Sequence, residues 1–138
     1  MAAHHVQGFG AFLAVGGGAA LGAWARWGLG LWLNPLFVAL PLGTLAANLV
    51  GGYLVGVAVG LFHLHAGLPP ALKLFVITGF LGGLTTFSTF SAEVTERLLG
   101  GHFWAGLGVA SVHLLGSVLL TALGLYTVGA HRLWSAAS

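Results

Sequence analysis

The chain has 138 residues, of which 58% are hydrophobic and only 4% are charged. Soluble domains carry charge on roughly 25% of their residues, so this composition excludes an ordinary soluble domain. The net charge of +2 comes from four basic and two acidic residues, without a basic cluster that would predict nucleic acid binding. The absence of cysteine excludes disulfides and thiolate metal sites.

Four long apolar segments predict membrane-spanning helices, which together make residues 1–138 a single transmembrane domain. They run over about 8–33, 36–64, 72–99 and 103–133, and each covers the roughly 20 residues that a helical span needs. Backbone polar groups must be paired inside a bilayer, which favours helices for such long segments. We therefore expect an all-α integral membrane protein whose loops are too short to hold a catalytic domain.

Small residues recur every four positions on the first two spans. They are Ala14, Gly18 and Gly22, followed by Gly52, Gly56 and Gly60. Such ladders let helix backbones approach closely in lipid, although glycine is also simply frequent in membrane helices. We expect close helix packing along the ladder of the second span.

The third span contains the run GFLGGLTTFSTFSAE at 79–93. Its double glycine, Gly82–Gly83, favours a break in the helix near the middle of the span. A break frees backbone carbonyls, which can hold a cation such as Na⁺, and N–H groups, which attract anions. An unbroken helix with packing glycines is the alternative.

Hydroxyl side chains are unusually dense just after the double glycine. They belong to Thr85, Thr86, Ser88, Thr89 and Ser91. Each hydroxyl can bond the carbonyl four residues earlier, but five in seven positions are too many for a lipid-facing helix. Phe87 and Phe90 share one helix face, and the positive edge of a phenyl ring can contact an anion. For these rings, lipid contact or core packing is the alternative.

Two other spans carry polar residues at helical spacing. Thr44 and Asn48 share a face of the second span, and the Asn48 amide can donate two hydrogen bonds. His113, Ser117 and Thr121 form a row on the fourth span. Polar side chains in membrane helices mark either a transport path or a hydrogen bond between helices, and the sequence leaves both open.

The basic residues do not predict a single orientation in the membrane. Lys73 and Arg132 lie on the side of the N-terminus, whereas Arg26 and Arg97 lie near the other side. The positive-inside rule requires an excess on one side, so we expect insertion in both orientations unless other cues select one. Two oppositely inserted copies can then pair about a two-fold axis in the membrane plane.

No motif predicts an enzyme. The only carboxylates, Glu93 and Glu96, lie near the end of the third span, where an ion pair between Arg26 and Glu93 is plausible. No acid lies deep in a span to carry protons, which disfavours a proton-coupled exporter.

Three motifs make the chain resemble the Fluc (CrcB) family of fluoride channels. They are GFLGGLTTFSTFSAE at 79–93, GxxxRW at Gly22–Trp27 and GTLxxNxxG at Gly43–Gly51. The resemblance implies an antiparallel, dual-topology homodimer in the cell inner membrane. It also implies that this homodimer exports fluoride passively, as a means of detoxification. The balanced charge count agrees with that topology. A small four-span, dual-topology multidrug exporter is the alternative, and a membrane scaffold without transport is a third.

The same resemblance implies roles for individual residues. Those matched to two fluoride pores at the dimer interface are Asn48, Phe87, Phe90, Ser88, Thr44, Ser117 and Thr121. Arg26 corresponds to an arginine at the aqueous vestibule. Gly82 and Thr85 correspond to positions whose backbone carbonyls, from both copies, hold a structural Na⁺ at the dimer centre. Residues without an assigned role are Thr86, Thr89, Ser91 and His113.

Overall fold

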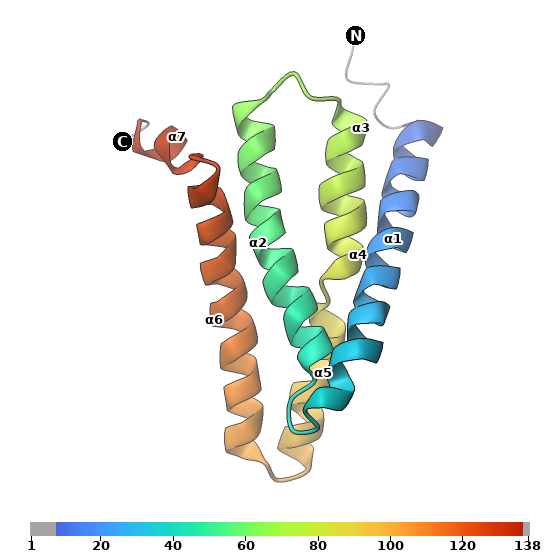
Figure 1. The fold of residues 1–138 in the computed structure, drawn as a ribbon, viewed down its shortest axis with the longest axis vertical. Helices are drawn as coiled ribbons and strands as arrows, with labels where there is room; N and C mark the ends of the chain where they lie inside the picture. Colours follow the sequence, from blue (N-terminus) through green and yellow to red (C-terminus); the bar gives the residue numbers. More distant parts are fainter. Residues whose placement is uncertain (1–7, 137–138) are drawn as a thin grey trace.

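The structure, a computed structural model, describes residues 8–136 of the chain, so the ends of the predicted domain, 1–7 and 137–138, lie outside it. Every regular element in the described range is helical, which confirms the all-α prediction (Figure 1). The elements are α1 (Phe9–Leu33), η2 (Asn34–Leu36), α2 (Leu42–Leu64), α3 (Pro70–Lys73), η3 (Leu74–Leu81), α4 (Gly82–Leu84), α5 (Phe87–Leu99), α6 (Phe103–Thr127) and α7 (His131–Ser135).

Three helical segments of the described range are long and apolar enough to cross a membrane. They are Leu42–Leu64, Pro70–Leu99 and Phe103–Thr127. Helix α1 has 25 residues, as many as α6, but its glycines, tryptophans and Arg26 make it less apolar than these three. A membrane span formed by α1 therefore stays a prediction.

The second long helix begins at Leu42 rather than near residue 36. Asn34–Leu36 form the short 3-10 turn η2, and the Asn34 Oδ1 atom accepts a hydrogen bond of 2.8 Å from the Gly43 N–H. This bond satisfies one of the free N–H groups at the start of α2, where Pro41 precedes the first turn. Leu36, which the apolar pattern assigned to the second span, thus belongs to the turn before α2.

The fourth long helix ends at Thr127, earlier than the predicted residue 133. Gly129 follows with a φ of +76°, a left-handed conformation that glycine adopts without steric cost. The chain turns there into the short helix α7, so the last residues of the predicted span form a separate element.

Glycines allow two pairs of helices to pack with their backbones in contact. A Cβ atom on Gly18 or Gly22 of α1 would collide with carbonyl oxygens of η3. A Cβ atom on Gly56 of α2 would collide with the Thr121 carbonyl oxygen of α6, and one on Gly124 of α6 would collide with the Tyr53 carbonyl oxygen of α2. The close packing predicted for the ladder of the second span is therefore confirmed, with α6 as its neighbour.

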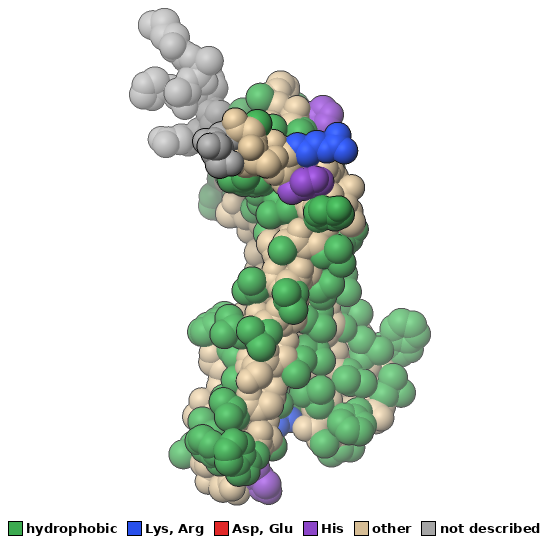
Figure 2. Space-filling view, turned by 90° about the vertical axis from the view of Figure 1, so that its left-hand side faces the viewer, with side chains coloured by type: hydrophobic (Ala, Val, Ile, Leu, Met, Phe, Trp, Pro, Cys, Tyr) green, Lys and Arg blue, Asp and Glu red, His purple; other side chains and the backbone are tan. Residues whose placement is uncertain are grey.

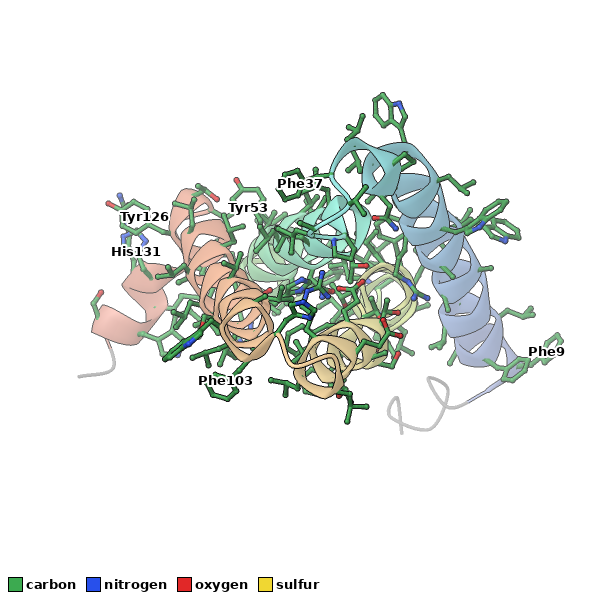
Figure 3. All side chains as sticks on the ribbon, turned by 90° about the horizontal axis from the view of Figure 1, so that it is seen from below. Phe9, Phe37, Tyr53, Phe103, Tyr126 and His131 are labelled. Carbon is green, nitrogen blue, oxygen red and sulfur yellow. The ribbon has the colours of Figure 1, made fainter. Side chains whose placement is uncertain are left out.

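Large apolar side chains cover the outside of the molecule. Trp27, Trp32 and Trp104 are among the exposed ones, and Figure 2 shows hydrophobic side chains along the length of one face, with basic and histidine side chains toward its ends. Figure 3 shows Phe9 and Tyr126 pointing away from the helices. No large side chain of the described residues is fully buried. This surface is suited to contact with lipid or with another apolar surface.

Candidate functional site

Two extended residues, Thr85 and Thr86, separate α4 from α5, and we call them the extended link (Figure 1). Their φ and ψ angles are −80° and 150° for Thr85, and −146° and 115° for Thr86. Gly82 and Gly83 keep helical conformations instead. The chain therefore leaves the helix after the double glycine, and the tight approach of Gly83 to Ala19 of α1 accounts for the absence of a side chain there.

Asn48 of α2 pairs with both backbone groups of Thr86. The Thr86 N–H donates to Asn48 Oδ1 at 2.7 Å, and Asn48 Nδ2 donates to the Thr86 carbonyl at 3.0 Å. Thr86 is 7% exposed, and buried backbone groups need hydrogen-bond partners. One side chain from another helix thus replaces the helical hydrogen bonds that the extended residue lacks.

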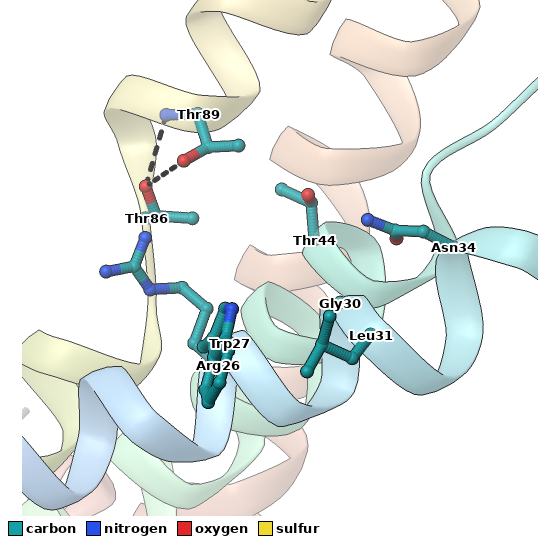
Figure 4. Close-up of a pocket in the computed structure, with 8 residues that line it drawn as sticks. All are labelled: Arg26, Trp27, Gly30, Leu31, Asn34, Thr44, Thr86 and Thr89. Carbon is teal, nitrogen blue, oxygen red and sulfur yellow. Dashed lines mark hydrogen bonds between the residues drawn. The ribbon is translucent and has the colours of Figure 1, made fainter.

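Thr86 also begins α5 through its side chain. Its Oγ1 atom accepts a bond of 3.1 Å from the Thr89 N–H, as an N-cap residue does, and it donates to Thr89 Oγ1 at 3.1 Å (Figure 4). Ser88 Oγ lies 3.2 Å from the same atom. Ser91 instead donates to the Phe87 carbonyl four residues earlier, at 2.8 Å. The hydroxyl run therefore divides into a cap, which includes the previously unassigned Thr86 and Thr89, and a local bond at Ser91.

A cavity of about 580 Å³, which we call the phenylalanine groove, lies between α2, the extended link, α5 and α6. Five of the predicted site residues line it, namely Asn48, Thr85, Phe87, Phe90 and Ser117. The Phe87 ring is 79% exposed and meets the Phe90 ring edge-on, with centroids 5.4 Å apart. The structure thus brings residues from three separate spans to one apolar groove with polar groups along it.

Other predicted residues do not line this groove. Thr121 Oγ1 bonds the Gly52 carbonyl of α2 at 2.9 Å and the Ser117 carbonyl at 2.8 Å, so its hydroxyl joins α6 to α2. Ser88 lies at the cap of α5, and Gly82 lies within the helical turn before the extended link. In the sequence, a hydroxyl that joins two helices has the same helical spacing as one that lines a groove.

A second cavity of about 280 Å³, the arginine pocket, contains Arg26 and Thr44 (Figure 4). Arg26 Nε donates to the Gly83 carbonyl at 3.1 Å, and Figure 4 shows its guanidinium beside the chain at Thr86. Thr44 Oγ1 donates to Glu93 Oε1 at 2.6 Å, and the other oxygen, Glu93 Oε2, is buried with no partner among the described residues. The Arg26–Glu93 ion pair suggested by the sequence is therefore wrong, because each side chain bonds a neutral group.

Thr86 is the residue that the two cavities share. It lines the arginine pocket together with Thr89, and it lines the phenylalanine groove together with Asn48 and Phe87. The extended link and its bond to Asn48 therefore lie between the arginine pocket, which the Arg26 side chain lines, and the phenylalanine groove, which the Phe87 and Phe90 rings line.

The comparison with known proteins identifies the family. Residues 13–125 match the family model described as "CrcB-like protein, Camphor Resistance (CrcB)". The chain belongs to the CrcB-like family. This confirms the resemblance found in the sequence, and the names of the relatives described next identify the family as one of ion channels rather than of enzymes.

Several relatives of this CrcB-like chain are named "Fluoride-specific ion channel FluC". The protein of Dechloromonas aromatica is 70% identical over 124 residues, which cover 90% of this chain and 92% of the relative. Those of Thiobacillus denitrificans and Ralstonia pickettii are 61% and 65% identical, over 86% and 85% of this chain and 95% and 93% of theirs. The match thus extends over nearly the whole length of these proteins.

The CrcB-like chain also has backbone carbonyls that are released from helical bonding near the extended link. In a continuous helix, the carbonyls of Gly82 and Thr85 would accept from the N–H groups of Thr86 and Thr89. Those N–H groups donate instead to Asn48 Oδ1 and to Thr86 Oγ1. Oxygen atoms of this kind suit a hard cation such as Na⁺, so the two predicted metal positions fit a carbonyl-held ion.

His113 of α6 is a residue of the groove to which the sequence gave no role. It is 2% exposed, its Nδ1 atom lies 3.1 Å from Asn48 Nδ2, and its ring centroid lies 4.8 Å from that of Phe90. The row formed with Ser117 and Thr121 signals a shared helix face, but helix spacing alone does not show which neighbour each side chain meets.

Proposed function

We propose that this chain forms a fluoride-selective channel, which lets fluoride leave the cell passively across the inner membrane and so detoxifies it. The names of its relatives support the ion, and the phenylalanine groove supports a route for it. The observation that carries the proposal is the meeting of Asn48, Phe87, Phe90 and Ser117 along one groove.

The chemistry of the groove suits a small, strongly hydrated anion. Such an ion must exchange its water for hydrogen-bond donors and positive ring edges, which hydroxyl, amide and phenyl groups supply. Among residues 8–136, no Lys or Arg lines the phenylalanine groove. Conduction requires binding that is favourable yet weak enough for release, and a fixed cation in the groove would oppose release.

Two copies in opposite orientations are the assembly that we propose. The equal distribution of basic residues allows both orientations, and the exposed Phe87 ring leaves the groove open on one side. A two-fold axis in the membrane plane would give each dimer two equivalent grooves, and so two fluoride paths. In this assembly α1 supplies the fourth span of each copy.

The remaining predicted residues extend the path beyond the groove. Thr44, Ser88 and Thr121 form the proposed polar track together with Ser117 of the groove, and Arg26 attracts fluoride to the aqueous vestibule. The arginine pocket supports this placing of Arg26, because it is an open cavity that shares Thr86 with the groove.

A structural Na⁺ at the dimer centre completes the proposal. The carbonyls of Gly82 and Thr85 from both copies would hold it, and its charge would offset the aligned carbonyl dipoles. Such an ion stabilises only the folded dimer, so the thermal unfolding midpoint should rise with Na⁺ concentration and not with equal concentrations of a bulky organic cation. An identical midpoint in both salts would contradict the sodium site.

Growth of a bacterium that lacks its own fluoride exporter tests the cellular role. Expression of this chain should restore growth in medium with fluoride, whereas the Phe87→Ile variant, expressed in the membrane to the same level, should restore less. Equal sensitivity with and without the wild-type chain would contradict fluoride detoxification.

A further inference from the structure

The turn that leads into the short helix α7 is packed against α2. Ala130, the residue before α7, is fully buried. A Cβ atom on Gly60 of α2 would collide with the Val128 side chain and crowd the Ala130 Cβ atom. The absence of a side chain at Gly60 therefore lets this turn lie directly on α2, which fixes the place where α7 begins.

Two aromatic contacts orient α7 on the ends of the long helices. The His131 ring stacks on the Tyr126 ring of α6, with centroids 4.5 Å apart and planes 20° apart, and Figure 3 shows the two side chains together. The Trp134 ring lies 5.9 Å from the His63 ring of α2. His131 and Trp134 are three positions apart, so they share one face of the helix. This face of α7 is therefore turned toward α6 and α2.

The other face of α7 carries Arg132 and Leu133. Both side chains are exposed, and the Arg132 guanidinium has no hydrogen bond or ion pair to another residue of the described chain. A guanidinium presents five N–H donors in a planar fork that matches the oxygens of a phosphate group. Arg132 is thus a cation whose donors are all available to a ligand.

No acidic side chain offsets the positive charge at this end of the molecule. The two acidic residues of the chain, Glu93 and Glu96, belong to α5, which Figure 1 shows toward the end opposite α7. Lys73 lies on the same side of the membrane-spanning region as Arg132, and Figure 2 shows basic and histidine side chains together on this end. The end with α7 is therefore complementary to a negatively charged surface.

The position of α7 corresponds to the headgroup region of a bilayer. The helix follows within a few residues of Thr127, the last residue of a candidate membrane span. Tyr126 is 64% exposed and Trp134 is 53% exposed, and these two residue types are enriched where a span reaches the headgroups. Arg132 consequently lies at about the depth of the lipid phosphates.

We propose that α7 is an interfacial helix that binds the headgroup of an anionic phospholipid, with the Arg132 guanidinium on the lipid phosphate and the Leu133 and Trp134 side chains beside the upper part of the acyl chains. The inference concerns the lipid around the protein and does not depend on the proposed fluoride path. The negative surface of a membrane attracts each nearby Lys or Arg by an amount equal to about a fivefold change in affinity, and the fork of an arginine adds geometric selectivity for phosphate.

Native mass spectrometry of the intact protein, released from detergent micelles, tests the inference with phosphatidylglycerol and phosphatidylcholine as probes. The wild-type chain should retain phosphatidylglycerol at lower lipid concentrations than phosphatidylcholine, which has the same phosphate but no net charge. Inorganic phosphate at the same concentration should not displace the lipid. Equal retention of the two lipids, or displacement by inorganic phosphate, would overturn a site for an anionic phospholipid.

Three variants separate this site from general surface charge. Arg132→Gln should weaken phosphatidylglycerol binding about fivefold, whereas Arg132→Lys should keep most of the affinity because it keeps the charge. Lys73→Gln, the matched control, removes the same charge on the same side but outside α7, so it should have a much smaller effect. Wild-type affinity in Arg132→Gln, or an equal loss in Lys73→Gln, would overturn the proposal.

Quenching of tryptophan fluorescence by brominated lipids locates the site in a bilayer. Full-length protein in vesicles should be quenched more by brominated phosphatidylglycerol than by brominated phosphatidylcholine, because the anionic lipid gathers beside Trp134. Trp134→Phe should remove this difference, while the quenching of the tryptophans elsewhere remains. A difference that persists in Trp134→Phe would place the anionic lipid away from α7 and would overturn the inference, whether or not the protein conducts fluoride.

Discussion

Removal of the Asn48 amide should destabilise the fold as well as the proposed path. In Asn48→Ala, the N–H and carbonyl groups of Thr86 both lose their partner, and Thr86 is only 7% exposed. An unpaired buried polar group costs about 1–3 kcal/mol, so two of them predict a loss of about 2–6 kcal/mol in the free energy of unfolding. Fluoride flux should fall in parallel, because the extended link loses its connection to α2.

The measurement is unfolding by a denaturing detergent, followed by tryptophan fluorescence, for wild type and variant in the same micelles. Tyr53→Phe is the matched control on the same helix, because it loses one exposed bond to Thr127, at 3.2 Å. Such a surface change should stay within about 0.5 kcal/mol of wild type. If Asn48→Ala unfolds like Tyr53→Phe, the Asn48 amide does not support the extended link.

Other predictions concern the rings, the glycine packing and the orientation. Phe87→Ile and Phe90→Ile should slow fluoride efflux while the variants still elute as dimers; full flux in both would remove the rings from the path. Gly56→Ala should lower the free energy of unfolding in detergent by about 1–3 kcal/mol, because the added Cβ atom collides with α6. In the control Gly10→Ala the added Cβ atom meets no atom within 4 Å, so the free energy of unfolding should not change. Equal effects of the two substitutions would contradict the packing. The chain has no cysteine, so an impermeant maleimide should label Gly67→Cys in intact cells to about half; complete or absent labelling would refute dual topology.

The sequence predicted those parts of the fold that depend on local composition. Apolar runs indicated the helices, and the ladder at Gly52, Gly56 and Gly60 indicated close packing, because both signals lie in residues that are near in the sequence. The ends of the helices were less predictable. Asn34 bonds Gly43 to form a turn, and Gly129 turns the chain before α7.

The site was less predictable, because its key bonds join residues that are distant in the sequence. The double glycine signals a break, yet the extended residues are Thr85 and Thr86, where Asn48 satisfies the backbone from another helix. Neighbouring hydroxyls look equivalent in the sequence, but Thr86 caps α5 whereas Ser91 bonds a local carbonyl.

His113 shows the same limit of sequence reasoning. Its helical spacing with Ser117 and Thr121 was visible, but its bond to Asn48 and its contact with Phe90 depend on how three helices pack.

Anion efflux from vesicles that contain the purified wild-type chain tests the central claim most directly. A proton carrier is added so that proton movement balances the charge of the departing anion. Vesicles loaded with sodium fluoride should then release fluoride rapidly, as measured by a fluoride electrode outside them. Matched vesicles loaded with sodium chloride should retain their chloride. No fluoride release, or equal release of both anions, would contradict a fluoride-selective channel.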